Sequence, residues 1–97
     1  MKVTLSRDAL RDRREAEAYY RQNSLSAVSR FRRDLSAAFR FIVEFPEGSP
    51  LAAQRTRKKR LLHFPYTIYY VVVAEQIFIT AVASELRDPV RYADRIV

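Results

Sequence analysis

Apolar residues recur along the chain in two patterns, one helical and one strand-like. From Arg7 to about Gln22 the sequence is rich in Ala, Arg and Glu, which are good helix formers, and Ser6 is a suitable N-cap. Apolar positions spaced as on one face of a helix are Ala9, Ala16 and Tyr20, and then Ala27, Phe31, Leu35, Ala38, Phe39 and Ile42. The short link between these stretches, and the helix breakers in "EFPEGSP", predict an antiparallel helical hairpin over about residues 6–45.

Beyond Pro50 the pattern becomes strand-like. The segments "KRLLHF", "YTIYYVVV" and "QIFITAVA" predict a three-stranded meander over about residues 57–84, and "KVTL" near the start of the chain also favours a strand. The order β-α-α-β-β-β predicts an α+β fold, with a helical hairpin packed on a small, twisted, mostly antiparallel sheet. In the middle strand, Tyr66, Ile68 and Tyr70 share one face, but the alternate residues are apolar too. This strand is therefore expected to be central and covered on both sides.

The length of the chain limits how much of the sheet it can cover. At 97 residues we expect a single domain with one thin core, spanning residues 1–97, and a C-terminal tail over residues 85–97 that forms a short helix or an ordered tail. The hairpin covers one sheet face, and little except the tail remains for the other. Uncovered apolar surface predicts a binding partner.

The net charge of +7 favours an acidic partner, nucleic acid or an anionic surface. Cations are densest at residues 55–60, directly before the most hydrophobic strand. In an extended strand, Lys58 and Arg60 would share one face, where two cations can bind phosphate or carboxylate groups. A run of charges held in water is the alternative interpretation, and both remain open.

Composition excludes several kinds of chemistry. The chain has no cysteine, which excludes disulfides and thiolate sites, and its single glycine excludes a glycine-rich phosphate loop. His63 is the only histidine, so neither a metal nor a cofactor is expected. The carboxylates, Asp12 and Asp34 among them, are scattered along the helices, and we expect no paired acid–base set. With no secretory signal and no apolar stretch of about 20 residues, we expect a soluble cytoplasmic protein without membrane contact.

Several segments resemble, in order and spacing, the ParE/RelE toxin superfamily of type II toxin–antitoxin systems. The strongest are the block from Arg60 to Tyr70, which includes "FPYTIYY", and the "AVA…RDP" block from Ala81 to Pro89. The resemblance covers essentially the whole chain and implies the small α+β toxin fold in the bacterial cytoplasm. It also implies a hetero-oligomer with a cognate ParD-like antitoxin, whose C-terminal segment wraps the toxin.

The two branches of the superfamily imply different functions. The ParE-like branch inhibits DNA gyrase by binding, whereas the RelE-like branch cuts mRNA on the ribosome as an endoribonuclease. Thr67 stands where RelE-like nucleases carry an arginine, and Ser84 stands where some relatives carry a histidine. The resemblance therefore favours the ParE-like, non-enzymatic function. The residues left for the nuclease alternative are Lys58, Arg60, Arg87 and Tyr92.

A decayed toxin that only binds its antitoxin is a third alternative. We expect the antitoxin to contact the sheet face and rim. The residues expected to bind the antitoxin or the target are Arg57, Lys58, Arg60, Tyr66, Tyr70 and Arg87.

Overall fold

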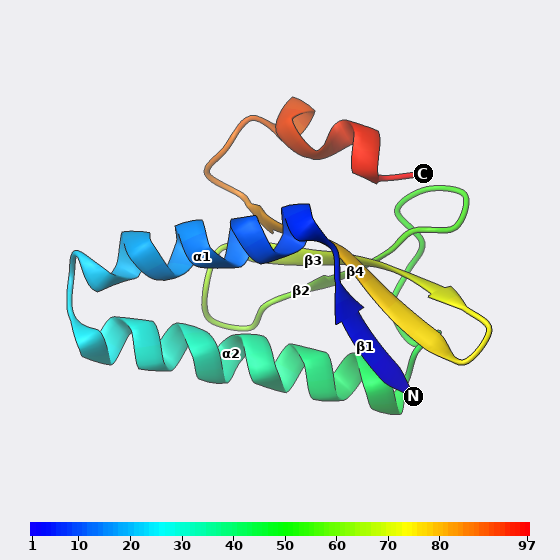
Figure 1. Cartoon of the computed structure of the whole chain (residues 1–97), viewed down its shortest axis with the longest axis horizontal. Helices are drawn as coiled ribbons and strands as arrows, with labels where there is room; N and C mark the ends of the chain where they lie inside the picture. The colour runs from blue at the N-terminus through cyan, green and yellow to red at the C-terminus, as the bar shows by residue number, and fades with distance from the viewer.

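The computed structural model describes residues 1–97 and confirms the predicted α+β class (Figure 1). Its elements are β1 (Lys2–Leu5), α1 (Arg7–Arg21), α2 (Leu25–Glu44), β2 (Arg57–Arg60), β3 (Tyr66–Val73), β4 (Gln76–Ser84) and the 3₁₀ helix η1 (Pro89–Arg95). Ser6 caps α1 by accepting a hydrogen bond from the Ala9 N–H at 3.1 Å, and Ser24 caps α2 in the same way through the Ala27 N–H at 3.0 Å. Neither α1 nor α2 has the length and hydrophobicity needed to cross a bilayer.

The four strands form one sheet in the order β1-β4-β3-β2. β3 pairs with β2 and β4 in antiparallel fashion, and β1 joins β4 in parallel, so the sheet is mostly antiparallel as predicted. The strand predicted in "KRLLHF" ends early, at Arg60. It ends there because the Asp34 carboxylate accepts hydrogen bonds from the His63 and Phe64 N–H groups, both at 2.9 Å, and draws this loop onto α2.

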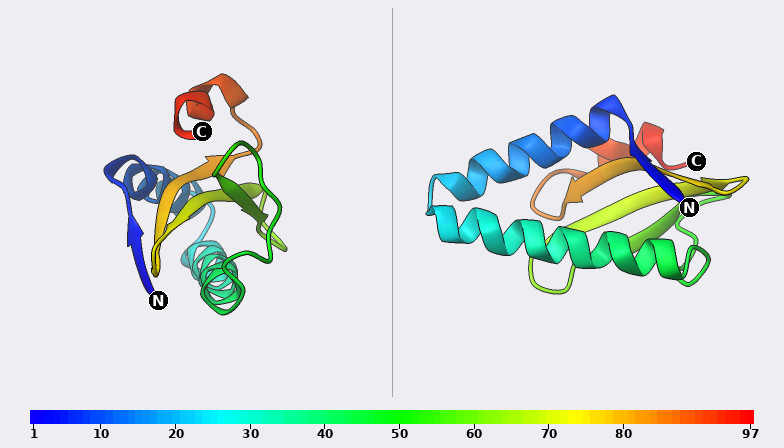
Figure 2. Two further views of the ribbon diagram at one scale, coloured as in Figure 1. Left: turned by 90° about the vertical axis from the view of Figure 1, so that its right-hand side faces the viewer. Right: turned by 60° about the horizontal axis from the view of Figure 1, so that its bottom comes forward.

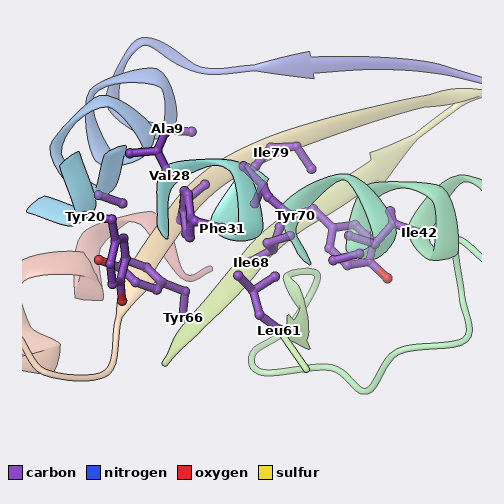
Figure 3. Packing of buried hydrophobic residues seen from close by; sticks show 14 of the residues in the cluster. Ala9, Tyr20, Val28, Phe31, Ile42, Leu61, Tyr66, Ile68, Tyr70 and Ile79 are labelled. Atoms are coloured by element: carbon purple, nitrogen blue, oxygen red, sulfur yellow. The ribbon is translucent and has the colours of Figure 1, made fainter. Parts of the chain in front are cut away.

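The main core lies between the helical hairpin and one face of the sheet. Phe31 of α2, with Ile68 and Tyr70 of β3, is fully buried there (Figure 3). Aromatic rings continue the core toward the helix link, where Tyr20 lies 5.5 Å from Phe31 between ring centroids. This packing confirms the stripes predicted for both helices and the shared face of the middle strand.

The C-terminal segment covers part of the other sheet face, which we call the outer face. η1 lies on the side of the sheet away from α2 (Figure 2). Its Tyr92 is buried against Ala81 and Ala83 of β4, with Tyr69 at the margin of this small second core. Of the two forms predicted for the tail, a short helix or an ordered tail, the structure has the short helix, which covers part of the outer face.

The C-terminal segment is fixed to the rest of the chain by polar contacts. Arg95 donates to the carboxylate of Asp12 at 2.7 Å, and the same carboxylate oxygen accepts from the Val82 N–H of β4 at 3.0 Å. The Val97 N–H donates to the Thr56 hydroxyl at 3.0 Å. Asp12 is 4% exposed and Asp34 is 5% exposed, so each of these carboxylates belongs to the interior and pairs with specific donors.

Candidate functional site

Two of the predicted cations lie together on the outer face. The register pairs Lys58 with Tyr69 and Arg60 with Thr67, and directly opposed residues in a sheet project from the same side. Tyr69 contacts the small core beneath η1, which identifies this side as the outer face. The prediction that Lys58 and Arg60 share one face is therefore confirmed.

Their neighbours in β2 point to the helix side. The Lys59 Nζ lies 4.3 Å from the centroid of the Phe41 ring of α2. The positive charge is attracted to the face of the ring in a cation–π contact. Arg57, predicted to bind a partner, donates to the Ser49 carbonyl at 2.8 Å. Its guanidinium thus holds the loop that precedes β2.

Arg60 has an internal partner that sequence reasoning missed. Its Nε and Nη2 donate to the two carboxylate oxygens of Glu85 at 2.7 and 3.0 Å, and Thr67 donates to the same carboxylate at 3.3 Å. The hydrogen bond from Arg60 lowers the pKa of Glu85 from its usual value. Glu85 is 25 residues from Arg60 in sequence, so no local spacing links the two. The charge of Arg60 is partly compensated inside the chain.

Arg87 follows β4 and lines two hollows beside this pair. It is exposed and is not part of any ion pair. One hollow also contacts Tyr66 and Tyr92, and the other contacts Glu85 and Tyr92. The Tyr92 hydroxyl accepts a hydrogen bond from the Ser84 N–H at 3.1 Å. The structure therefore brings the outer-face cations Lys58 and Arg60 into one region with Arg87 and Tyr92.

The positions of Tyr66 and Tyr70 require a correction. Tyr70 is fully buried under the helices, where its hydroxyl donates to the Pro46 carbonyl at 3.0 Å. Tyr66 is 6% exposed and packs on Phe31, with ring centroids 5.2 Å apart (Figure 3). Burial raises the pKa of Tyr66 above its usual value, so its phenol is a weaker proton donor than that of an exposed tyrosine. Both tyrosines are therefore part of the core, and Tyr66 also lines the hollow beside Arg87.

The arrangement is suited to binding anions. Lys58 and Arg87 present exposed cations, and Arg60 adds a third that is shared with Glu85. No cluster of three potential metal ligands is present. His63 lies elsewhere, in a hollow that it shares with Arg30 and other residues of α2.

The fold resembles that of a solved structure. A chain of the chromosomal ParDE TA system from P. aeruginosa superposes with a TM-score of 0.63 at 18% sequence identity, covering 87% of this chain and 95% of that one. No curated protein is significantly similar in sequence.

The family follows from the sequence itself. The family described as the ParE toxin of the type II toxin–antitoxin system parDE matches residues 3–89. The chain therefore belongs to the ParE toxin family, whose members are toxins of type II toxin–antitoxin systems.

Proposed function

We propose that the protein inhibits DNA gyrase by binding to it and is neutralised by a cognate ParD-like antitoxin in the bacterial cytoplasm. The observation that carries this proposal is the match to the ParE toxin family over residues 3–89. The exposed cations of the outer face, Lys58 and Arg87, are the residues that would contact gyrase. Cations on a surface promote rapid association with an acidic partner.

Three features of the region around Arg87 support binding rather than RNA cleavage. RNA cleavage through the 2′-hydroxyl needs a group that accepts a proton and cations that stabilise the charge on phosphate. Here Arg60 already pairs with Glu85, and burial raises the pKa of Tyr66. The Tyr92 hydroxyl is buried, and it accepts a backbone hydrogen bond.

The antitoxin part of the proposal is supported by charge and by the structural neighbour. The chain carries a net charge of +7, which favours an acidic partner. The similar chain from P. aeruginosa belongs to a ParDE TA system. We therefore infer a hetero-oligomer of this toxin with the antitoxin encoded beside its gene.

Induced expression in bacteria tests the proposal. We expect slower growth, loss of negative supercoiling in a reporter plasmid on chloroquine gels, and intact translated messages by primer extension. Co-expression of the neighbouring antitoxin should restore both growth and supercoiling. The variant K58E/R87E should lose the effect, whereas R7E/R14E, with the same change in charge on exposed positions of α1, should keep it.

Other outcomes would overturn the proposal. Cut messages with normal plasmid topology would indicate the RelE-like endoribonuclease, and Arg87→Ala should then abolish cleavage. Unchanged growth, with the folded toxin present at high level, would indicate a decayed toxin.

A further inference from the structure

A second cationic region lies along the free edge of β2, where the seam between β2 and α2 meets the margin of the outer face. Three shallow hollows there share Leu62 in their linings. This residue belongs to the loop between β2 and β3, which passes beside α2 (Figures 1 and 2). We call this region the α2–β2 groove, and the residues that define it are Arg30, Arg33, Phe41, Lys59, Arg60 and Leu62. We propose that it binds an extended acidic peptide segment of a partner protein, which, if the proposed function holds, belongs to the antitoxin.

Charge is the first argument. The lining of the three hollows contains five cations and two carboxylates. Both carboxylates are already engaged, because Asp34 accepts two backbone N–H groups and Glu85 accepts from Arg60. Arg30 and Arg33 have no ion-pair partner. The groove therefore offers uncompensated positive charge to a ligand.

An exposed apolar side chain at the centre is the second argument. Leu62 is 73% exposed, in a loop of only five residues between β2 and β3. The two hydrogen bonds to Asp34 fix the neighbouring backbone and hold Leu62 in place. Phe41 and Ala37 of α2 lie half-buried beside it. A ligand with apolar side chains would bury this surface.

The outer edge of β2 is the third argument. The Lys58 N–H points away from β3 and donates to the Pro50 carbonyl at 3.0 Å. In an antiparallel strand the direction repeats every second residue, so the N–H and C=O of Arg60 point the same way. The loop that covers Lys58 makes no backbone hydrogen bond to Arg60. An extended peptide can therefore pair with the edge at this residue.

These features together select an acidic peptide over other occupants. A second copy of the chain would bring a net charge of +7 to a cationic groove, and like charges repel. Single-stranded nucleic acid binds through aromatic rings on which its bases stack, but Phe41 is half-buried with Lys59 over its ring. An acidic peptide can supply apolar side chains to cover Leu62, backbone groups to pair with the edge at Arg60, and carboxylates for the cations.

Fluorescence anisotropy tests the inference with a labelled peptide of about twelve residues that alternates glutamate and leucine. We expect the wild-type chain to bind it more tightly than a peptide that alternates lysine and leucine. R30E/R33E should weaken binding by about tenfold or more, and Leu62→Ser by about tenfold. The matched control R7E/R14E should bind within about twofold of wild type. Circular dichroism of each variant confirms that it is folded.

Equal binding by R30E/R33E and R7E/R14E would overturn the inference, because net charge alone would then explain affinity. Tighter binding of a dT12 oligonucleotide than of the acidic peptide would also overturn it, in favour of a nucleic-acid groove. Binding of the antitoxin encoded beside the gene to the same variants tests the groove assignment separately from the antitoxin pairing. If the antitoxin binds wild type and R30E/R33E equally, the groove assignment fails while the antitoxin pairing stands. If the acidic peptide binds but the antitoxin does not, the pairing fails and the groove stands.

Discussion

Replacing Asp12 with alanine should destabilise the fold strongly. The carboxylate is buried between α1, β4 and the C-terminal segment, where it accepts from the guanidinium of Arg95 and from the Val82 N–H. Removing it leaves a guanidinium that is 15% exposed, and a backbone donor, without their partner. Breaking a buried ion pair in this way costs about 3–5 kcal/mol.

We expect a value near the lower end of that range, about 3 kcal/mol, because Asp8 lies 3.9 Å from Arg95 and can take over part of the interaction. A domain of this size has a free energy of unfolding of about 5–15 kcal/mol. The loss should lower the melting temperature by roughly 12–24 °C.

Urea unfolding followed by circular dichroism measures the change in free energy. Asp8→Ala is the matched control, because Asp8 is on the same helix and roughly half exposed, and it should cost less than about 1 kcal/mol. Adding Arg95→Met to Asp12→Ala removes the unpaired charge and should recover part of the loss. The reasoning is refuted if Asp12→Ala costs no more than Asp8→Ala.

Two further predictions concern the β3–β4 loop and the Arg60–Glu85 pair. Ala74 has a positive φ of 55°, which strains a residue with a Cβ. Ala74→Gly should therefore raise the free energy of unfolding by about 1 kcal/mol in the urea assay. The neighbouring Glu75→Gly is the control and should not raise it. Because Arg60 lowers the pKa of Glu85, the contribution of this pair is complete at neutral pH and is lost as pH falls through the lowered value, below 4.5. The stability difference between wild type and Glu85→Gln should therefore shrink as pH falls from 7 to 3, and a constant difference would contradict the pairing.

Periodicity in the sequence was sufficient to predict both helices, the meander and the order of elements. It could also have revealed that Asp12 is buried, since this residue is three after Ala9 and four before Ala16 in the apolar stripe. Its partners could not be found in this way, because Val82 and Arg95 are 70 and 83 residues away. Contacts at such separations depend on the tertiary fold.

The binding residues were only partly predictable for a related reason. Alternation correctly placed Lys58 and Arg60 on one face, and it correctly grouped Tyr66 with Tyr70. Because β3 is apolar on both sides, alternation could not decide which face the helices cover. The groove around Leu62 depends on a loop held by Asp34, a contact between α2 and a distant segment that the sequence pattern does not contain.

The most direct test of the central claim is the supercoiling of relaxed plasmid DNA by purified gyrase in the presence of the purified chain. We predict that micromolar wild-type protein inhibits supercoiling, that K58E/R87E does not, and that R7E/R14E inhibits as wild type does. Undiminished supercoiling at saturating concentrations of folded wild-type protein would contradict the account.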